Sequence, residues 1–435
     1  MDPFQLAALL ITIAAAFSYV NHRFLGLPSS IGLMALGLAA SLVVIAAGAV
    51  WPGVSERAVK VLEAVSFDRA LMEGMLGFLL FAGALHVDLD DLFEQKGVIA
   101  LTATLGLLLS TAIVGALLHA VAGALGLDVS FAVCLVFGAL ISPTDPIAVL
   151  AILKSLGAPR TLATKIAGES LFNDGVAVVV FLALVAIAVG GDAHGHAPDA
   201  AGIAQLFAME AIGGVAYGLA IGGVGYAMMK SIEDYQVEVL LSLALVAGGY
   251  SLAMALHVSG PLAMVVAGVF IGNTGRRFAM GPKTREHLDT FWHLVDEMLN
   301  AVLFVLIGLE VLVIDFAPAW LAVGVAAVPI VLLARFLAVA LPVQALRRFR
   351  PFTPHAIKVM TWGGLRGGIS VALALSLRET LGARDLATYE GIVLATYVVV
   401  VFSIAVQGAT MAPLLRRLGL ANAPGASHAH AVVTD

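Results

Sequence analysis

Three carboxylates stand inside long apolar runs of this sequence, where a charged side chain is costly. Asp145, Glu169 and Asp174 each lie in stretches that are rich in Leu, Val, Ala and Gly. A charged residue at the centre of a membrane-spanning helix costs roughly 2.5–3.5 kcal/mol and commonly marks an ion pathway or a proton relay. A carboxylate takes up protons, and its hard oxygens also suit small cations. The residue types therefore predict reversible binding of cations and protons inside a membrane.

Asp145 lies between Pro143 and Pro146, inside an apolar run over residues 129–153. The prolines remove two amide donors and clash with the preceding turn, so we expect the helix to be interrupted here. An interrupted helix is tolerated at membrane depth only around a cavity or a site. Free carbonyl oxygens beside a carboxylate predict a hard-oxygen cation site. The alternative is a kinked packing helix in which Asp145 caps the second half.

Asp174 lies near the middle of the next apolar run, in which Ser170 is four residues away. Residues four apart share a helix face, so this face offers a hydroxyl and a carboxylate to an ion. Glu169 and Asn173 are also four apart and share the adjacent face, where they can support the structure. Polar contacts between helices are the alternative, but two carboxylates favour an ion site.

Arg366 lies among Gly363, Gly364, Gly367 and Gly368, which predict a second broken span. Each glycine in a helix costs about 1 kcal/mol relative to alanine. The Arg366 guanidinium needs an anion at this depth.

We expect Glu169 to be the anion that pairs with Arg366, because Asp145 and Asp174 are required for the cation. Arg335 lies in a helical segment, and we expect it to bond the exposed carbonyls of a broken span or a nearby carboxylate. Both arginines are predicted to support the site rather than to bind the cation.

The composition predicts the class of protein that holds these residues. The chain has 435 residues, of which 61% are hydrophobic and only 12% charged, whereas a soluble domain has about 25% charged residues. About 20 apolar residues span a bilayer as a helix. We therefore predict an all-α polytopic membrane protein. No dense basic run indicates nucleic-acid binding, and no Gly-x-x-x-x-Gly-Lys-Ser/Thr motif indicates ATP as the energy source.

The apolar segments suggest about 13 transmembrane helices in a single transmembrane transporter domain over residues 1–435. The approximate limits are 4–20, 29–50, 71–87, 98–121, 129–153, 161–190, 203–229, 237–256, 259–273, 291–313, 320–346, 357–377 and 388–414. Thirteen spans fit two halves of six spans joined by one linker helix. A single linker helix inverts the second half relative to the first, which is a common transporter design. We expect an inverted repeat over 1–190, a linker helix over 203–229, a second repeat over 237–417 and a disordered cytoplasmic tail over 418–435. The fifth and twelfth segments, both interrupted, then correspond.

The loops predict the orientation of the chain. Thirteen spans place sixteen Lys and Arg residues on the side of the C-terminus and five on the opposite side. Short cytoplasmic loops carry an excess of positive residues. We expect the C-terminus in the cytoplasm and the N-terminus outside.

Four motifs, in this order along the chain, resemble those of the NhaP-type sodium/proton antiporters of the cation:proton antiporter superfamily. They are Gly77–Leu85 (GFLLFAGAL), Ser142–Pro146 (SPTDP), Glu169–Gly175 (ESLFNDG) and Gly363–Gly367 (GGLRG). The resemblance covers essentially the whole chain. It implies a scaffold bundle and a transport core in which the broken spans 5 and 12 cross. It also implies a homodimer in the bacterial inner membrane, with no cofactor and no enzymatic activity.

The resemblance implies a role for each site residue. Asp174 is the principal carboxylate for the cation and the proton, with Thr144, Asp145 and Ser170 completing the site. Asn173 fixes the geometry, and Glu169 and Arg366 form a buried ion pair. One departure is Ala82, where many relatives carry an acid; Glu73 lies too far along the helix to replace it.

The resemblance also bears on stoichiometry and on the alternatives. Electrogenic relatives have Asp where this chain has Asn173, which implies electroneutral exchange of one sodium or lithium ion for one proton. Potassium/proton exchange is the main alternative. A cation channel would need a repeated filter loop, and an intramembrane protease using Asp145 and Asp174 would need a Gly-x-Gly-Asp setting; the sequence has neither.

Overall fold

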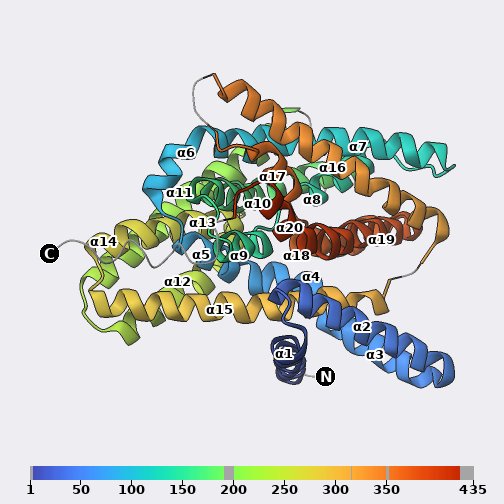
Figure 1. Ribbon diagram of the computed structural model, residues 1–435, viewed down its shortest axis with the longest axis horizontal. Coiled ribbons are helices and arrows are strands. Elements are labelled where there is room, and N and C mark those ends of the chain that lie inside the picture. The colour runs from blue at the N-terminus through green and yellow to red at the C-terminus, as the bar shows by residue number, and fades with distance from the viewer. Residues whose placement is uncertain (1–2, 191–199, 315, 349–351, 422–435) are drawn as a thin grey trace.

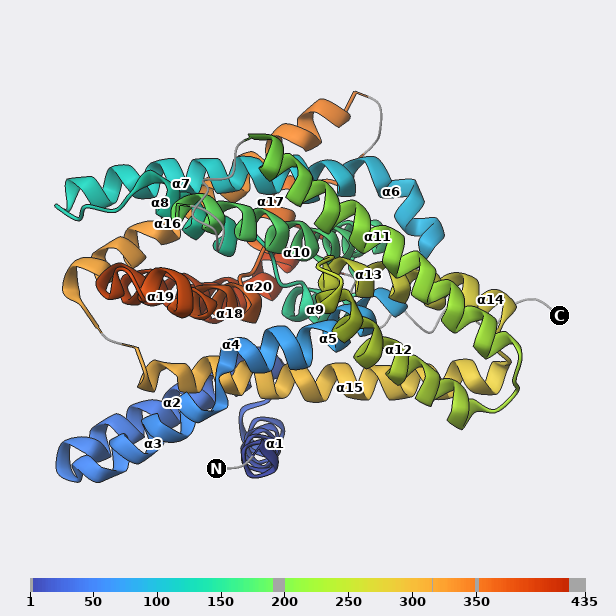
Figure 2. The same cartoon turned by 180° about the vertical axis from the view of Figure 1, so that it is seen from behind.

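The computed structural model describes residues 3–190, 200–314, 316–348 and 352–421, and these form helices joined by short connections. The predicted tail beyond residue 421 lies outside the described residues. Within the described ranges the only β-type pairing is an isolated bridge between Asp145 and Leu365. Figures 1 and 2 show α15 (Pro282–Leu309) crossing the lower part of the molecule and α7 (Leu107–Ala124) with α16 (Pro318–Leu346) in the upper part.

The helices follow one another with few residues between them. The first part of the chain contains α1 (Pro3–Val20), α2 (Ser29–Val50), α3 (Pro52–Val65), α4 (Phe67–Arg69), α5 (Leu76–Leu85), α6 (Leu89–Leu101), α8 (Phe131–Ile141), α9 (Ile147–Ser155) and α10 (Arg160–Ala188). The second part contains α11 (Ala200–Lys230), α12 (Tyr235–Ala255), α13 (Gly260–Phe270), α14 (Arg276–Phe278), α17 (Ala356–Trp362), α18 (Gly368–Ser376), α19 (Leu386–Phe402) and α20 (Ala409–Arg417). Tighter or wider turns extend several of them, namely η1 (Asn21–Leu25), η2 (Ala70–Met75), η3 (Thr102–Gly106), η4 (Ile271–Gly275), η5 (Glu310–Leu312), η6 (Arg378–Gly382) and η7 (Ser403–Gly408).

The helices have the length and composition of membrane spans. Within the described residues, eight are long and apolar enough to cross a bilayer. An isolated lipid-facing backbone must satisfy its own polar groups, which a continuous helix does. The prediction of an all-α polytopic membrane protein is confirmed, whereas the count of thirteen spans stays a prediction.

Both predicted interruptions are present. The predicted fifth span divides into α8, which ends at Ile141, and α9, which begins at Ile147. The predicted twelfth span divides into α17, which ends at Trp362, and α18, which begins at Gly368. The two breaks cross, since the Asp145 N–H donates to the Leu365 carbonyl at 2.8 Å. Each extended segment thus gives the other a backbone partner that its own helix no longer provides.

The crossing is enclosed by long helices. The element α8 packs against α7, α10 and α18, and α17 packs against α16 and α20. The helix α15 packs against α2, α5 and α12. Around the crossing the buried apolar side chains form three clusters, of which the largest joins α2, α8, α15, α16, α18 and α19. The breaks therefore lie inside the protein and not against lipid.

Glycine is required at the second break because side chains from other segments approach its backbone closely. A Cβ atom on Gly367 would lie 2.4 Å from a carboxylate oxygen of Asp145, and one on Gly364 would lie 2.4 Å from Nε of Arg335. The glycines predicted to weaken the helix also make room for two of the predicted site residues.

Candidate functional site

Asp145 occupies the break between α8 and α9. Its carboxylate accepts a hydrogen bond from the Ile147 N–H at 2.9 Å, so it caps the first turn of α9. Acidic residues are favourable at a helix N-terminus, because its amides carry partial positive charge. The side chain is only half-buried and lines a cavity of about 1010 Å³. Asp145 therefore both caps α9, as the alternative interpretation required, and faces a space where an ion can bind.

Thr144, Ser170 and Asn173 form one buried hydrogen-bonded group beside Asp145. The Thr144 and Ser170 hydroxyls lie 2.9 Å apart, and the Asn173 amide donates to the Thr144 hydroxyl at 3.0 Å. The Asn173 side-chain oxygen accepts from the Thr144 N–H at 3.4 Å. Asn173 thus holds the break against α10 from both sides of Thr144. The sequence placed Ser170 with Asp174 and Asn173 with Glu169, but the structure brings Ser170 and Asn173 to the same threonine.

Asp174 lies on α10 and lines the same cavity as Asp145. Its side chain is 8% exposed, and within the described residues no hydrogen bond or ion pair reaches it. A buried carboxylate without a partner is costly in its charged form. A proton or a cation in the cavity would remove that cost. The structure therefore brings the two predicted ligand carboxylates to one cavity.

Glu169 pairs with Arg335 rather than with Arg366, so the expected pairing is wrong. Both carboxylate oxygens accept from the two Nη atoms of Arg335, with the second contact at 3.0 Å. The side chains are almost fully buried. Arg335 also donates from Nε and Nη2 to the Met360 carbonyl on α17, at 3.3 and 3.1 Å. The expectation for Arg335 named both kinds of partner, a carboxylate and a carbonyl of a broken span, and it is confirmed.

Arg366 instead serves the other break. Its Nη1 donates to the carbonyls of Ser142 and Pro143, the latter at 2.9 Å, and its backbone N–H donates to the Ser403 hydroxyl at 2.9 Å. The guanidinium is buried. These two carbonyls of the first break therefore each accept a hydrogen bond from Arg366.

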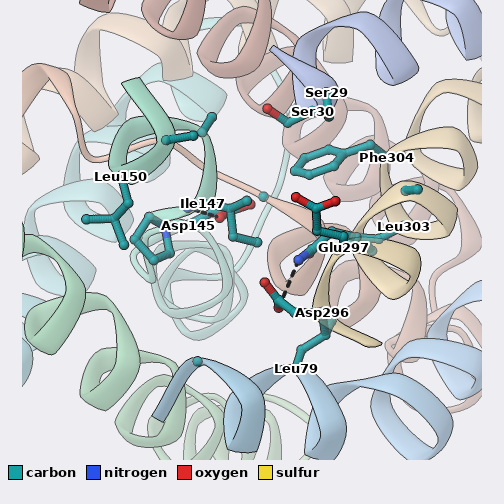
Figure 3. A pocket seen from close by; sticks show the side chains of 18 of the residues that line it. Ser29, Ser30, Leu79, Asp145, Ile147, Leu150, Asp296, Glu297, Leu303 and Phe304 are labelled. Carbon is teal, nitrogen blue, oxygen red and sulfur yellow. Dashed lines mark hydrogen bonds between the residues drawn. The ribbon is translucent and has the colours of Figure 1, made fainter. Parts of the chain in front are cut away.

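The cavity has a second acidic wall that sequence reasoning missed. Asp296 and Glu297 lie on α15, across the cavity from Asp145 (Figure 3). Asn300, one turn further along, donates to Asp296 at 3.0 Å, while its own side-chain oxygen is buried and has no partner. The sequence feature that could have indicated this wall is a pair of adjacent acids inside an apolar segment, with Asn300 four residues after Asp296.

The third-span residues contribute no carboxylate to this cavity. Ala82 is buried and Glu73 is exposed on η2. The described residues contain no group of three or more His, Cys, Asp or Glu side chains suited to a bound metal ion. The carboxylates that line the cavity come from the break before α9, from α10 and from α15.

Comparison with known proteins shows the family of the chain. Residues 9–417 match the family described as "Sodium/hydrogen exchanger, transmembrane". The chain belongs to this family of transmembrane exchangers. It is 49% identical to the Na(+)/H(+) antiporter NhaP of Pseudomonas aeruginosa, over 95% of this chain and 96% of that protein. It is 35% identical to the Na(+)/H(+) antiporter NhaH of Halobacillus dabanensis, over 96% and 98% of the two chains.

The fold is also that of a solved antiporter. The structure of the sodium proton antiporter MjNhaP1 from Methanocaldococcus jannaschii superposes with a TM-score of 0.75, covering 96% of this chain and 99% of that one at 18% identity. At that identity the match speaks for the fold alone. The resemblance to NhaP-type antiporters is confirmed by the family match and the relatives together.

Proposed function

We propose that this protein is a secondary active antiporter that exchanges sodium or lithium ions for protons across the membrane. The observation that carries the proposal is the convergence of Asp145 and Asp174 on one cavity, beside the crossing of two broken spans. The relatives named above are sodium/proton antiporters, which favours sodium over the potassium alternative.

We propose that Asp174 and Asp145 bind the cation or the proton, with the hydroxyls of Thr144 and Ser170 as further ligands. Asn173 holds Thr144 in place through two hydrogen bonds. The support is geometric, because Thr144 lines the cavity together with both carboxylates and its hydroxyl lies 2.9 Å from the Ser170 hydroxyl. The supporting charges are Glu169 with Arg335, which fix α10 to α16, and Arg366, which fixes the first break.

Exchange follows from competition for the same negative charge. Glu169 is paired with Arg335, and the charge of Arg366 at the crossing offsets one of the two carboxylates, so one proton or one monovalent cation neutralises the site. Only a neutral site crosses an apolar barrier at low cost. An empty site is charged and is held on one side. Loaded forms therefore change access, and each cation that crosses in one direction is balanced by protons in the other. Because Asn173 carries no proton, we propose a stoichiometry of one to one.

The arrangement in the cell follows from the sequence features. We propose a homodimer in the bacterial inner membrane, with the N-terminus outside and the C-terminus in the cytoplasm. We also propose that residues 1–190 and 237–417 are inverted repeats joined by the linker helix over 203–229. The fifth and twelfth spans, one in each half, are both interrupted, and this similarity supports the repeat.

The test is proton movement in proteoliposomes after addition of sodium, lithium or potassium. Sodium is expected to release protons, with no change when the membrane potential is collapsed. The apparent affinity for sodium should weaken as the pH falls, by up to about tenfold per pH unit, because one proton displaces one cation. A pH-independent affinity, or exchange that responds to potassium alone, would refute the proposal.

A further inference from the structure

A second cavity, of about 430 Å³, lies further along α15 and α18, the two helices that also line part of the first cavity. Its wall contains Glu310 of η5, Asp68 and Arg69 of α4, Arg378 of η6 and Glu390 of α19. The first cavity uses α15 as far as Phe304 and α18 as far as Ser370. The second uses the continuation of both helices, at Glu310 and at Leu375. The two cavities therefore follow the same pair of helices.

Only a short apolar plug separates the cavities. Phe304 and Glu310 are six residues apart, about 9 Å at 1.5 Å per residue. Between them Val305, Leu306 and Ile307 are buried, and on α18 Val371 and Leu373 are buried beside the same cluster. The present arrangement is thus closed over about two helical turns and hollow on either side.

Glu310 is the unusual residue of the second cavity. The side chain is 7% exposed, and no hydrogen bond or ion pair reaches it from the described residues. It lines the cavity, so its carboxylate borders space and not a packed apolar wall. A carboxylate so enclosed needs a proton, a cation or ordered water to compensate its charge.

The charges around Glu310 favour a cation over an anion. The cavity is lined by four carboxylates, on Asp68, Glu310, Glu379 and Glu390, and by two guanidinium groups, on Arg69 and Arg378. Arg69 pairs with Glu379 at the exposed rim. One arginine is left for the three remaining acids, so the enclosed region carries an excess of negative charge. A cleft lined by one sign of charge concentrates ions of the opposite sign.

We propose that the second cavity is the access vestibule on the opposite side of the membrane, and that Glu310 binds a monovalent cation or a proton there before the Asp145 and Asp174 site turns towards it. This inference rests on the proposed antiport. When the plug between α15 and α18 opens, an ion held at Glu310 lies about two helical turns from the first cavity. Glu310 acts on loading from its own side and leaves loading from the first cavity unchanged.

The test uses the full-length protein and compares the two sides of the membrane. Exchange is measured in right-side-out and in everted membrane vesicles, with sodium and pH varied on the outer face of each preparation. Glu310→Gln should weaken the apparent affinity for sodium about tenfold in the orientation that exposes Glu310. In the other orientation the affinity should be unchanged. Glu310→Asp should restore most of the loss, because it keeps the charge.

Glu56→Gln is the matched control, since Glu56 is an exposed carboxylate on α3 outside the cavity, and it should behave as the wild type. An equal loss in both orientations that Glu310→Asp does not rescue would mean a structural role and would overturn the inference. So would an unchanged Glu310→Gln variant. If the wild type itself shows no cation-linked proton movement, the proposed antiport fails instead.

Discussion

Between Ile141 and Ile147 the chain breaks at prolines, whereas between Trp362 and Gly368 it breaks at glycines, and the two breaks carry opposite charges. The proline break presents Asp145 to the cavity. The glycine break carries Arg366, whose guanidinium donates hydrogen bonds to the carbonyls of Ser142 and Pro143 in the proline break. The two interruptions therefore differ in function: one provides a carboxylate that lines the cavity, and the other provides hydrogen-bond donors to the first.

The crossing combines a proline break with a glycine break because each provides what the other lacks. Prolines expose carbonyls and cannot supply donors, and at the first break those carbonyls are satisfied by Arg366. Glycines keep their amides and take no space, so Gly367 admits the Asp145 carboxylate. We infer that the glycine break supports the site and that the proline break, with α10, performs the ion chemistry.

The largest expected effect comes from removing the charge that anchors the glycine break. Arg335→Met leaves Glu169 buried and unpaired, and the loss of one partner of a buried ion pair costs about 3–5 kcal/mol of stability. The check is the thermal midpoint of the detergent-solubilised protein. In the double variant Arg335→Met with Glu169→Gln, much of the loss should be recovered. A single variant as stable as the wild type would disprove the role of the pair.

The next effect concerns the link between the breaks. Arg366→Met removes the donor to Ser142 and Pro143, and a buried acceptor left without a partner costs about 1–3 kcal/mol. The thermal midpoint should fall less than for Arg335→Met, and Arg366→Lys should be intermediate. Equal losses for the methionine and lysine variants would contradict the view that the forked geometry matters.

A smaller effect tests the space at the crossing. Gly367→Ala places a methyl group 2.4 Å from an Asp145 oxygen, and small misplacements of a site group can cost tenfold to about a hundredfold. The apparent affinity for sodium should fall about tenfold while the protein still folds. Gly97→Ala is the control, because a Cβ there meets nothing within 4 Å. If both alanine variants bind sodium alike, the close approach has no functional meaning.

The smallest effect lies outside both breaks. Asp296→Asn removes one charge from the wall of the first cavity, which should weaken the apparent affinity for sodium about threefold and more at low ionic strength than at high. Exposed Glu233, in the loop between α11 and α12, provides the comparison as Glu233→Gln. A loss for Asp296→Asn as large as that of Gly367→Ala would place ion chemistry on α15 as well.

The sequence predicted both breaks because proline and glycine act through local geometry. It also identified Asp145 and Asp174 as residues that face a common space, since buried charge is costly wherever it lies. It did not predict that Glu169 meets Arg335, because that pairing depends on α16 lying against α10. Asp296 was missed for a related reason. The apolar segment begins near residue 291, which suggests an interfacial acid, but α15 starts at Pro282 and carries Asp296 into the protein.

The central claim is that one cation and one proton compete for the carboxylates at the crossing. The most direct measurement is sodium-triggered proton release in proteoliposomes for the wild type, Asp174→Asn and Asp128→Asn, the last being an exposed carboxylate in the loop before α8. We predict release in the wild type and in Asp128→Asn, and none in Asp174→Asn. Undiminished release from a folded Asp174→Asn variant would contradict the account.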